Sequence, residues 1–231
     1  MALSISQTNT MVSLFRQELE LCKVKHGETI AVLSEAEQAV EYASAFMIAA
    51  QELGADVFNV NLPSRPTGPT QVAGEVGQNV LAGNTPAIEA LKSANLVVDL
   101  IFLLFSKEQL EIQAADTRIL LVVEPFEVLT RLFPKQELRD RVEAAEARLT
   151  KARNLRFTNP AGTDVSYELG KFPVLTEYGF TDTPGRWDHW PGGFVATQGS
   201  ETGVNGKVVM DRGDILFPFN KYLQEPIEFT I

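Results

Sequence analysis

The sequence has few of the residues that disulfide and metal chemistry require. Among 231 residues there is one cysteine, Cys22, and there are two histidines, His26 and His189. A single cysteine forms neither an internal disulfide nor a cysteine-based metal cluster, and it suits a reducing compartment such as the cytoplasm. His26 falls at the predicted end of the first helix, where a cation stabilises the helix dipole. A facial triad of two histidines and one carboxylate is therefore not expected, and we predict no metal ligands within these residues.

Basic residues and long apolar runs are also scarce. Lysine and arginine number 20 against 30 aspartates and glutamates, which gives a net charge of −10. Such a surface repels phosphate backbones and anionic lipids, and no local basic patch offsets it. The longest apolar run, residues 96–105, contains Asp99 and is too short to span a bilayer. We therefore expect neither a nucleic-acid partner nor a membrane partner.

Motifs for nucleotide binding and for serine hydrolysis are missing. No Gly-x-Gly-x-x-Gly sequence follows a predicted strand, and no phosphate-binding loop with Gly-Lys-Ser/Thr is present. The nucleophile elbow Gly-x-Ser-x-Gly is absent as well. These absences argue against a nucleotide cofactor and against a serine hydrolase.

What is present predicts an α/β first domain over residues 1–152. Strand-like apolar runs cover residues 29–33, 56–62, 96–104 and 118–123. Helical patterns cover residues 4–24, 35–53, 85–94, 107–114, 125–132 and 134–152. Strands that alternate with helices predict a doubly wound, mostly parallel sheet, in which ligands bind outside the carboxyl ends of the strands.

After residue 152 the pattern changes to short strand-like runs separated by turn signals. They cover residues 155–158, 165–169, 204–210 and 226–231. We predict a β-rich second domain over residues 153–231. Its last run ends at Ile231 without a partner strand, so this domain looks incomplete and we expect the native chain to continue.

The most unusual stretch is residues 177–197, EYGFTDTPGRWDHWPGGFVAT. It places both tryptophans and His189 within four residues, between Pro-Gly pairs. The prolines and glycines predict a shaped loop, and loops held by a rigid scaffold often carry chemistry. His189 beside Asp188, with Glu177 twelve residues earlier, could form a carboxylate-oriented imidazole that acts as a general base. Composition alone favours the alternative that the aromatic rings close the end of a sheet.

Two other acidic positions allow more than one interpretation. Asp99 interrupts an apolar strand and must find hydrogen bonds or a charged partner, which could be the neighbouring backbone. The corner from Glu124 to Glu127 could be a paired-carboxylate site. Glu127 also fits the first turn of a helix, where acids offset the dipole, and we take this structural interpretation as the prediction.

Three segments of the sequence are distinctive: LVVD at 96–99, RILL with VEP at 118–125, and TEYGF…PGRWDHWP…GF at 176–194. They resemble the 2,5-dihydroxypyridine 5,6-dioxygenase family, the iron(II) ring-cleaving enzymes of nicotinate degradation. The resemblance covers the whole chain, and this family is related to the aminopeptidase T group of metallopeptidases. It implies an α/β domain followed by a β-rich domain, a homo-oligomer, Fe(II) as cofactor, and a small aromatic substrate with O2.

The resemblance also assigns roles to four residues. His189 would be the base on the substrate hydroxyl, Leu104 and Phe105 would line the substrate pocket, and Glu177 lies in the motif that closes it. Deprotonation would make the ring electron-rich enough to be opened between carbons 5 and 6, giving N-formylmaleamate.

The chain departs from the pattern of these families at three places. The family's iron ligands, two histidines and an aspartate, are expected beyond residue 231. Phe105 stands where the well-known dioxygenase has a histidine, which is compatible with a less polar hydroxylated ring as substrate. Phe194 stands where the peptidase relatives have a metal-binding glutamate, which argues against a two-metal aminopeptidase. An aminopeptidase T-like metallohydrolase and a non-catalytic fragment are the alternatives.

Overall fold

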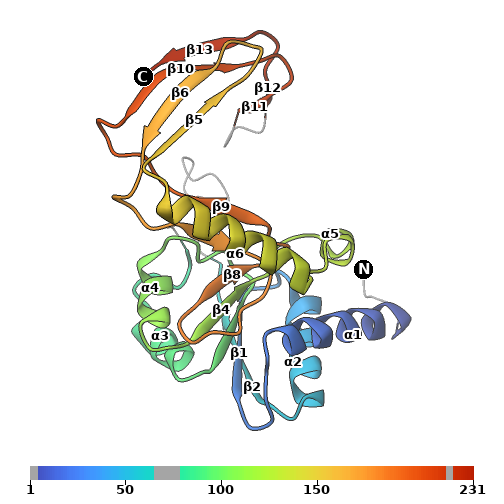
Figure 1. Ribbon diagram of the computed structural model, residues 1–231. Coiled ribbons are helices and arrows are strands. Elements are labelled where there is room, and N and C mark those ends of the chain that lie inside the picture. The colour runs from blue at the N-terminus through green and yellow to red at the C-terminus, as the bar shows by residue number, and fades with distance from the viewer. Residues whose placement is uncertain (1–4, 65–78, 217–220) are drawn as a thin grey trace. The chain divides into compact units, whose positions relative to one another are not determined.

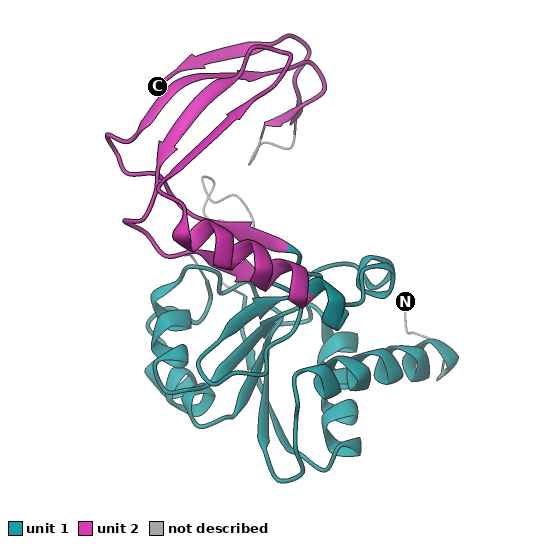
Figure 2. Ribbon diagram, in the orientation of Figure 1, with its two compact units in different colours: residues 1–138, 177–193 teal, residues 139–176, 194–231 magenta. Residues whose placement is uncertain are grey.

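The computed structural model describes residues 5–64, 79–216 and 221–231. Two compact units divide the chain: unit 1 comprises residues 1–138 and 177–193, and unit 2 comprises residues 139–176 and 194–231 (Figure 2). The sequence predicts a single domain boundary between residues 152 and 153. The compact units differ from that division because residues 177–193 return to unit 1, where they supply a strand to its sheet.

Unit 1 is built on a five-stranded sheet with the order β2-β1-β3-β4-β8 (Figure 1). The strands are β1 (Thr29–Glu35), β2 (Asp56–Leu62), β3 (Leu96–Asp99), β4 (Arg118–Leu121) and β8 (Trp187–His189). All four neighbouring pairs run parallel. Every residue of β3 and β4 is buried, as expected for central strands that helices cover on both faces. The predicted α/β class with a parallel sheet is confirmed.

Helices cover both faces of this sheet. They are α1 (Ile5–Leu21), α2 (Val40–Glu52), α3 (Thr85–Lys92), α4 (Lys107–Gln113) and α5 (Phe126–Arg131). Figure 1 shows α1 and α2 on one side of the sheet and α3 and α4 on the other. On the α3/α4 side the apolar core contains Leu33, Val97, Ile119, Ile88, Leu91 and Ile112, with Trp187 packed against it. None of the helices in the described ranges has the length and hydropathy that crossing a membrane requires.

Aromatic rings form the core on the α1/α2 side. Phe15 of α1 stacks on Phe46 of α2 with 3.9 Å between the ring centroids. Trp190, the residue after β8, is fully buried and meets Phe15 and Phe133 edge to face at 5.8 and 5.6 Å. Trp187 and Trp190 are therefore packed on opposite faces of the sheet and hold β8 in place between them.

The prediction of a loop over residues 177–197 was wrong at residues 194–196, which form a short strand, and at residues 187–189. The latter residues extend the parallel sheet as β8, with Ile119 in register with Trp187 and Leu121 in register with His189. Tertiary pairing decides the structure here, because a Trp-Asp-His triplet has no apolar run or alternation that identifies a strand.

Strand β3 is also shorter than predicted, because it ends at Asp99 and not at Leu104. The Asp99 carboxylate accepts the backbone N–H groups of Ile101 and Leu103 at 2.9 and 2.7 Å. Phe102 and Phe105 adopt positive φ angles of 67° and 58°, which an extended strand cannot contain. The chain thus leaves the sheet as a turn at the carboxyl end of β3.

Unit 2 contains an antiparallel sheet with the strand order β13-β10-β6-β5. Its elements are β5 (Asn154–Thr158), β6 (Asp164–Glu168), β10 (Val204–Met210) and β13 (Ile227–Thr230), with the shorter strands β7 (Leu175–Glu177), β9 (Phe194–Ala196), β11 (Ile215–Leu216) and β12 (Lys221–Tyr222). Helix α6 (Gln136–Lys151) spans the border between the units in the sequence. The expectation that the last strand has no partner was wrong, because β13 pairs with β10 from Met210↔Ile227 to Lys207↔Thr230.

Candidate active site at the carboxyl edge of the parallel sheet

His189 is the last residue of β8 and lies at the carboxyl edge of the parallel sheet. Leu121 of β4 is its register partner, and Asp99 of β3 is in turn the register partner of Leu121. Side chains in register point to the same face, so Asp99 and His189 share a face with one strand between them, roughly 10 Å apart at Cα. Ligands of open α/β sheets bind at this edge.

Two carboxylates flank the imidazole of His189. Nδ1 lies 3.5 Å from Oε2 of Glu177, and Nε2 lies 4.0 Å from Oε1 of Glu124. Nε2 is buried and has no hydrogen-bond partner among the described residues. The two nitrogens therefore differ: a carboxylate lies close to Nδ1, whereas Nε2 faces a carboxylate across a gap longer than a hydrogen bond.

Backbone contacts fix the two glutamates. Glu177 ends β7, and its carbonyl oxygen accepts the N–H of Gly193 at 2.8 Å. Glu124 follows β4, and its carbonyl oxygen accepts the hydroxyl of Tyr42 at 2.9 Å. Burial, together with the charges of Glu127 and Glu124, raises the pKa of Tyr42 to about 12. The tyrosine is therefore protonated at neutral pH and remains a donor to Glu124.

Asp188 supports β8 but does not orient the imidazole. Consecutive strand residues point to opposite faces, so its carboxylate lies on the side away from the His189 ring. Its Oδ1 accepts the backbone N–H groups of Tyr178, Gly179 and His189 at 3.0, 2.8 and 2.9 Å, and its Oδ2 accepts Nη2 of Arg186 at 2.7 Å. Burial raises the pKa of Asp188 to about 6, while Arg186 and the backbone donors act in the opposite direction. Of the two predicted orienting carboxylates, only Glu177 approaches the ring.

Two glycines of the long motif allow two backbone segments to touch beside the site. Gly192 has φ +64°, and a Cβ atom there would lie 2.2 Å from the backbone nitrogen of Gly179. Gly179 itself has φ +103° and donates its N–H to Asp188. A side chain at residue 192 would push apart the segments that carry Glu177 and His189.

Asp99 is a fully buried carboxyl group whose two oxygens bind backbone N–H groups of the following turn. Burial raises the pKa of Asp99 to about 6, whereas the hydrogen bonds from residues 101–103 and the charge of His189 lower it. Because the pKa is higher in the folded chain than the roughly 3.9 of an unfolded one, the folded chain binds this proton more tightly. The resulting stability is present below pH ~4 and is lost as the pH rises through about 6.

Replacing Asp99 with asparagine should flatten this pH dependence. Wild-type unfolding free energy is expected to fall as the pH rises from ~4 through ~6, and D99N should lose only part of that fall, because burial also raises the pKa values of Asp188 and Glu18. Urea denaturation at four pH values measures it, with Glu111→Gln on the exposed face of α4 as the control. A D99N slope equal to that of the wild type would contradict the role of Asp99.

Leu104 and Phe105, the predicted substrate-lining residues, lie on the turn that follows β3. Leu104 is half-buried, and 59% of the Phe105 surface is exposed. Phe105 donates its N–H to Oε1 of Gln109 at 2.7 Å, and Ser106 caps α4 by accepting the N–H of Gln109. The turn starts at the sheet edge that carries Asp99. The ring that stacks near His189 is Trp187, with centroids 6.4 Å apart.

Comparisons with known proteins decide the family. The family model described as NicX, 2,5-dihydroxypyridine 5,6-dioxygenase, matches residues 10–231. The chain belongs to the 2,5-dihydroxypyridine 5,6-dioxygenase family. This confirms the resemblance predicted from the motifs around residues 96, 118 and 176.

The 2,5-dihydroxypyridine 5,6-dioxygenase of Pseudomonas putida KT2440 is 42% identical over 225 residues, which are 96% of this chain and 64% of the relative. A solved structure of 2,5-dihydroxypyridine dioxygenase from P. putida KT2440 superposes with a TM-score of 0.92 at 41% identity, covering 100% of this chain and 66% of that one. This chain thus spans just under two thirds of the length of both. AmpT from Thermus thermophilus shares the fold alone, with a TM-score of 0.51 at 13% identity over 90% of this chain and 66% of that one.

Glu124 is a site residue that the sequence analysis considered only as half of an alternative paired-carboxylate site and did not predict. Glu127 does occupy the first turn of α5, as predicted for this corner, but Glu124 lies opposite Nε2 of His189. No local pattern separates these two acids. One signal was available: Glu124 directly follows a predicted strand. In open α/β sheets, ligands bind at this carboxyl end of the strands.

A metal site is not assembled by the described residues. They contain no group of three or more histidine, cysteine, aspartate or glutamate side chains that could hold a metal ion. Near His189, Glu177 and Glu124 lie at opposite nitrogens of one ring, so they do not converge on a common point. These residues therefore do not by themselves fit the iron centre that the sequence resemblance implies.

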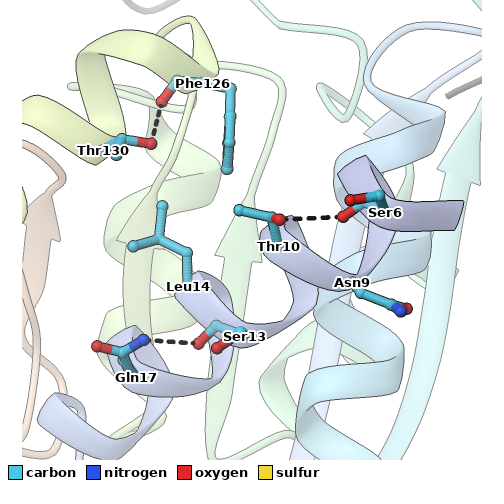
Figure 3. A pocket seen from close by; sticks show the side chains of 8 residues that line it. All are labelled: Ser6, Asn9, Thr10, Ser13, Leu14, Gln17, Phe126 and Thr130. Atoms are coloured by element: carbon cyan, nitrogen blue, oxygen red, sulfur yellow. Dashed lines mark hydrogen bonds between the residues drawn. The ribbon is translucent and has the colours of Figure 1, made fainter. Parts of the chain in front are cut away.

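A groove of about 690 Å³ lies between α1 and α5 in unit 1 (Figure 3). It is lined by Ser6, Asn9, Thr10, Ser13, Leu14, Gln17, Phe126 and Thr130. Thr10, Gln17 and Thr130 donate side-chain hydrogen bonds to carbonyl oxygens of their own helices. The groove has no acid or base among its lining residues, so the His189 cluster is the better candidate for catalysis.

Proposed function

We propose that this chain is part of a non-haem iron(II)-dependent, extradiol-type dioxygenase that opens the ring of 2,5-dihydroxypyridine or a similar hydroxylated aromatic ring, as in nicotinate degradation. Family membership and the printed activity of the relatives support this proposal. The structural observation that carries it is the His189 imidazole, with Nδ1 3.5 Å from Glu177 and with Nε2 buried and unpartnered. Its partners would be a small aromatic substrate and O2.

His189 would act as the general base on a ring hydroxyl. The Glu177 carboxylate beside Nδ1 favours the tautomer that carries its proton there, which leaves the Nε2 lone pair to accept the substrate proton. Glu177 would then stabilise the imidazolium and contact the substrate where the motif closes the site. Loss of the hydroxyl proton makes the ring electron-rich, and this favours its oxidation.

The proposed cofactor, Fe(II), would be held by ligands other than the described residues, since these do not assemble a metal site. The family resemblance supports two histidines and an aspartate as its ligands. The steps proposed for this chain accordingly involve only its own side chains.

Leu104 and Phe105 would form an apolar wall of the substrate pocket. This role is supported by the exposed ring of Phe105 and by its position on the turn at the carboxyl end of β3. The positive φ of Phe105 fixes the direction of its side chain, and such strained backbone concentrates at functional sites.

Replacing Phe105 with histidine should improve turnover of 2,5-dihydroxypyridine. Histidine adds a hydrogen-bonding group for a polar ring, and it tolerates positive φ better than most residues, so the fold should accept it. We expect kcat/KM to rise about tenfold, the value of one good hydrogen bond in binding. Steady-state kinetics measures it, with Phe105→Leu as the control, and unchanged kinetics would show that this position does not set substrate choice.

We also propose a cytoplasmic homo-oligomer. The single, buried free thiol of Cys22 supports a reducing compartment. Residues 1–15 contain no charged side chain although the net charge is −10, and this stretch of α1 lines the uncharged groove, so a second copy could pack there without charge repulsion. Sedimentation of the full-length protein as a monomer at all concentrations would contradict this assembly.

The function is tested by anaerobic Fe(II) titration of the full-length protein, followed by 2,5-dihydroxypyridine and O2 with ring absorbance monitored. We expect loss of ring absorbance that depends on both iron and O2. Iron-loaded protein that leaves the substrate intact would overturn the proposal.

A further inference from the structure

We infer that Glu124 is the group that removes the proton from His189 after substrate deprotonation and delivers it to solvent. The inference rests on the proposed function of His189 as a base. It assigns a role to a residue outside the long motif of residues 176–194.

The geometry places Glu124 opposite the nitrogen that would receive the substrate proton. Glu124 follows β4, the strand that pairs with β8, and its Oε1 lies 4.0 Å from Nε2 of His189. A charged N–H···O hydrogen bond measures about 2.8 Å, so a side-chain movement of roughly 1 Å closes the gap. Nε2 has no other partner in the described part of the chain that would compete for this contact.

Exposure distinguishes Glu124 from the other carboxyl groups near the ring. The Glu124 side chain is 38% exposed, compared with 18% for Glu177. Asp99 is fully buried, and both of its oxygens accept backbone N–H groups. Of the two carboxylates beside the imidazole, Glu124 therefore has the greater contact with water.

The backbone of Glu124 is held while its carboxylate remains movable. The Tyr42 hydroxyl donates to its carbonyl oxygen at 2.9 Å, which fixes the main chain at the end of β4. No hydrogen bond is found for the Glu124 carboxylate within residues 5–64, 79–216 and 221–231, so its side chain can rotate between the imidazole and solvent. Such rotation is what a proton shuttle requires, and it also gives the substrate hydroxyl access to Nε2.

Protons balance in two steps without a further reactant. First the substrate O–H bond breaks and an Nε2–H bond forms, which leaves a ring oxyanion and an imidazolium. The Nε2–H bond then breaks as an O–H bond forms on Glu124, which restores the neutral imidazole. Glu124 finally transfers the proton to water or to a buffer base, and no oxidation or reduction is involved.

The first test compares Glu124→Gln with Glu127→Gln in the full-length protein. Glu127 is an exposed acid on the same corner, three residues further along, and is the matched control. E124Q should lower kcat about tenfold or more with KM changed less than twofold, because general acid–base steps contribute at least this much. Added formate or imidazole should restore kcat in E124Q and have no effect on the wild type or on E127Q. Wild-type kcat in E124Q, or a loss that buffer does not restore, would overturn the inference.

A second test measures the nitrogen-15 signals of the His189 ring directly and does not require turnover. Nitrogen-15 NMR of the side chain distinguishes Nδ1 from Nε2, and the spectrum of His189→Gln assigns the signals. E124Q should shift the Nε2 signal more than the Nδ1 signal, E177Q should do the opposite, and E127Q should shift neither. An Nε2 signal that is unchanged in E124Q would contradict the contact.

The two tests separate this inference from the function it rests on. A wild-type protein that never opens the ring refutes the proposed function, and the NMR comparison still decides whether Glu124 acts on Nε2. A protein that loses activity in H189A but keeps it in E124Q refutes the role of Glu124 alone.

Discussion

Replacing His189 with alanine is expected to lower turnover of 2,5-dihydroxypyridine by about 100-fold or more, the range typical of a lost general base. The imidazole is the group at the carboxyl edge of the sheet with a buried, unpartnered nitrogen, and Glu177 lies beside its other nitrogen. Alanine removes both the proton acceptor and the cation that would form next to the carboxylates. Single-turnover kinetics in excess O2 measures the effect.

His26→Ala is the matched control, because it removes the other histidine of this chain. His26 is exposed, and its ring lies against Gly54 at the end of the sheet opposite to His189. The His26→Ala variant should therefore keep wild-type turnover. Unfolding curves of both variants exclude a global loss of structure. A loss below about threefold in H189A would remove His189 from the mechanism.

Replacing Asp188 with alanine should destabilise unit 1 by about 3–5 kcal/mol, the loss typical of removing one partner from a buried ion pair. Four donors lose their acceptor at once: the N–H groups of Tyr178, Gly179 and His189, and the guanidinium of Arg186. Each buried donor left without an acceptor costs about 1–3 kcal/mol, and the removed side chain leaves a cavity. Guanidinium denaturation followed by tryptophan fluorescence measures the loss, because both tryptophans flank Asp188.

Glu89→Ala provides the comparison for Asp188, because it breaks an exposed ion pair in the same unit. Glu89 pairs with Lys92 at 2.7 Å, and 59% of its side chain is exposed. Such pairs contribute about 0–1 kcal/mol. If D188A were as stable as E89A, the hydrogen bonds of Asp188 would not be what holds β8.

Periodicity in the sequence is sufficient to predict the parallel sheet and the helices that cover it. Strands β1, β2 and β4 are apolar runs, and the helical patterns between them repeat every three to four residues. The fifth strand was not predictable in this way, because Trp187–His189 pairs with residues nearly seventy positions earlier and contains a polar centre. The end of β3 depends on which N–H groups the Asp99 carboxylate reaches, and this needs the geometry of the turn.

The candidate site was predictable to the extent that its residues lie in one motif. His189 and Glu177 come together as expected, whereas the adjacent Asp188 points to the other face because the segment is a strand and not a loop. Glu124 reaches the imidazole from a neighbouring strand. Sequence distance conceals such neighbours in parallel sheets, because each crossover separates adjacent strands by a helix.

The return of residues 177–193 to unit 1 decides how this protein can be divided for expression. A fragment that ended at residue 152 would lack β8, and with it the imidazole of His189. It would also leave the backbone of the apolar strand β4 as an open edge, which pairs readily with other chains and promotes aggregation. A soluble version of the α/β unit therefore has to carry its last strand on a new linker that joins residue 138 to residue 177.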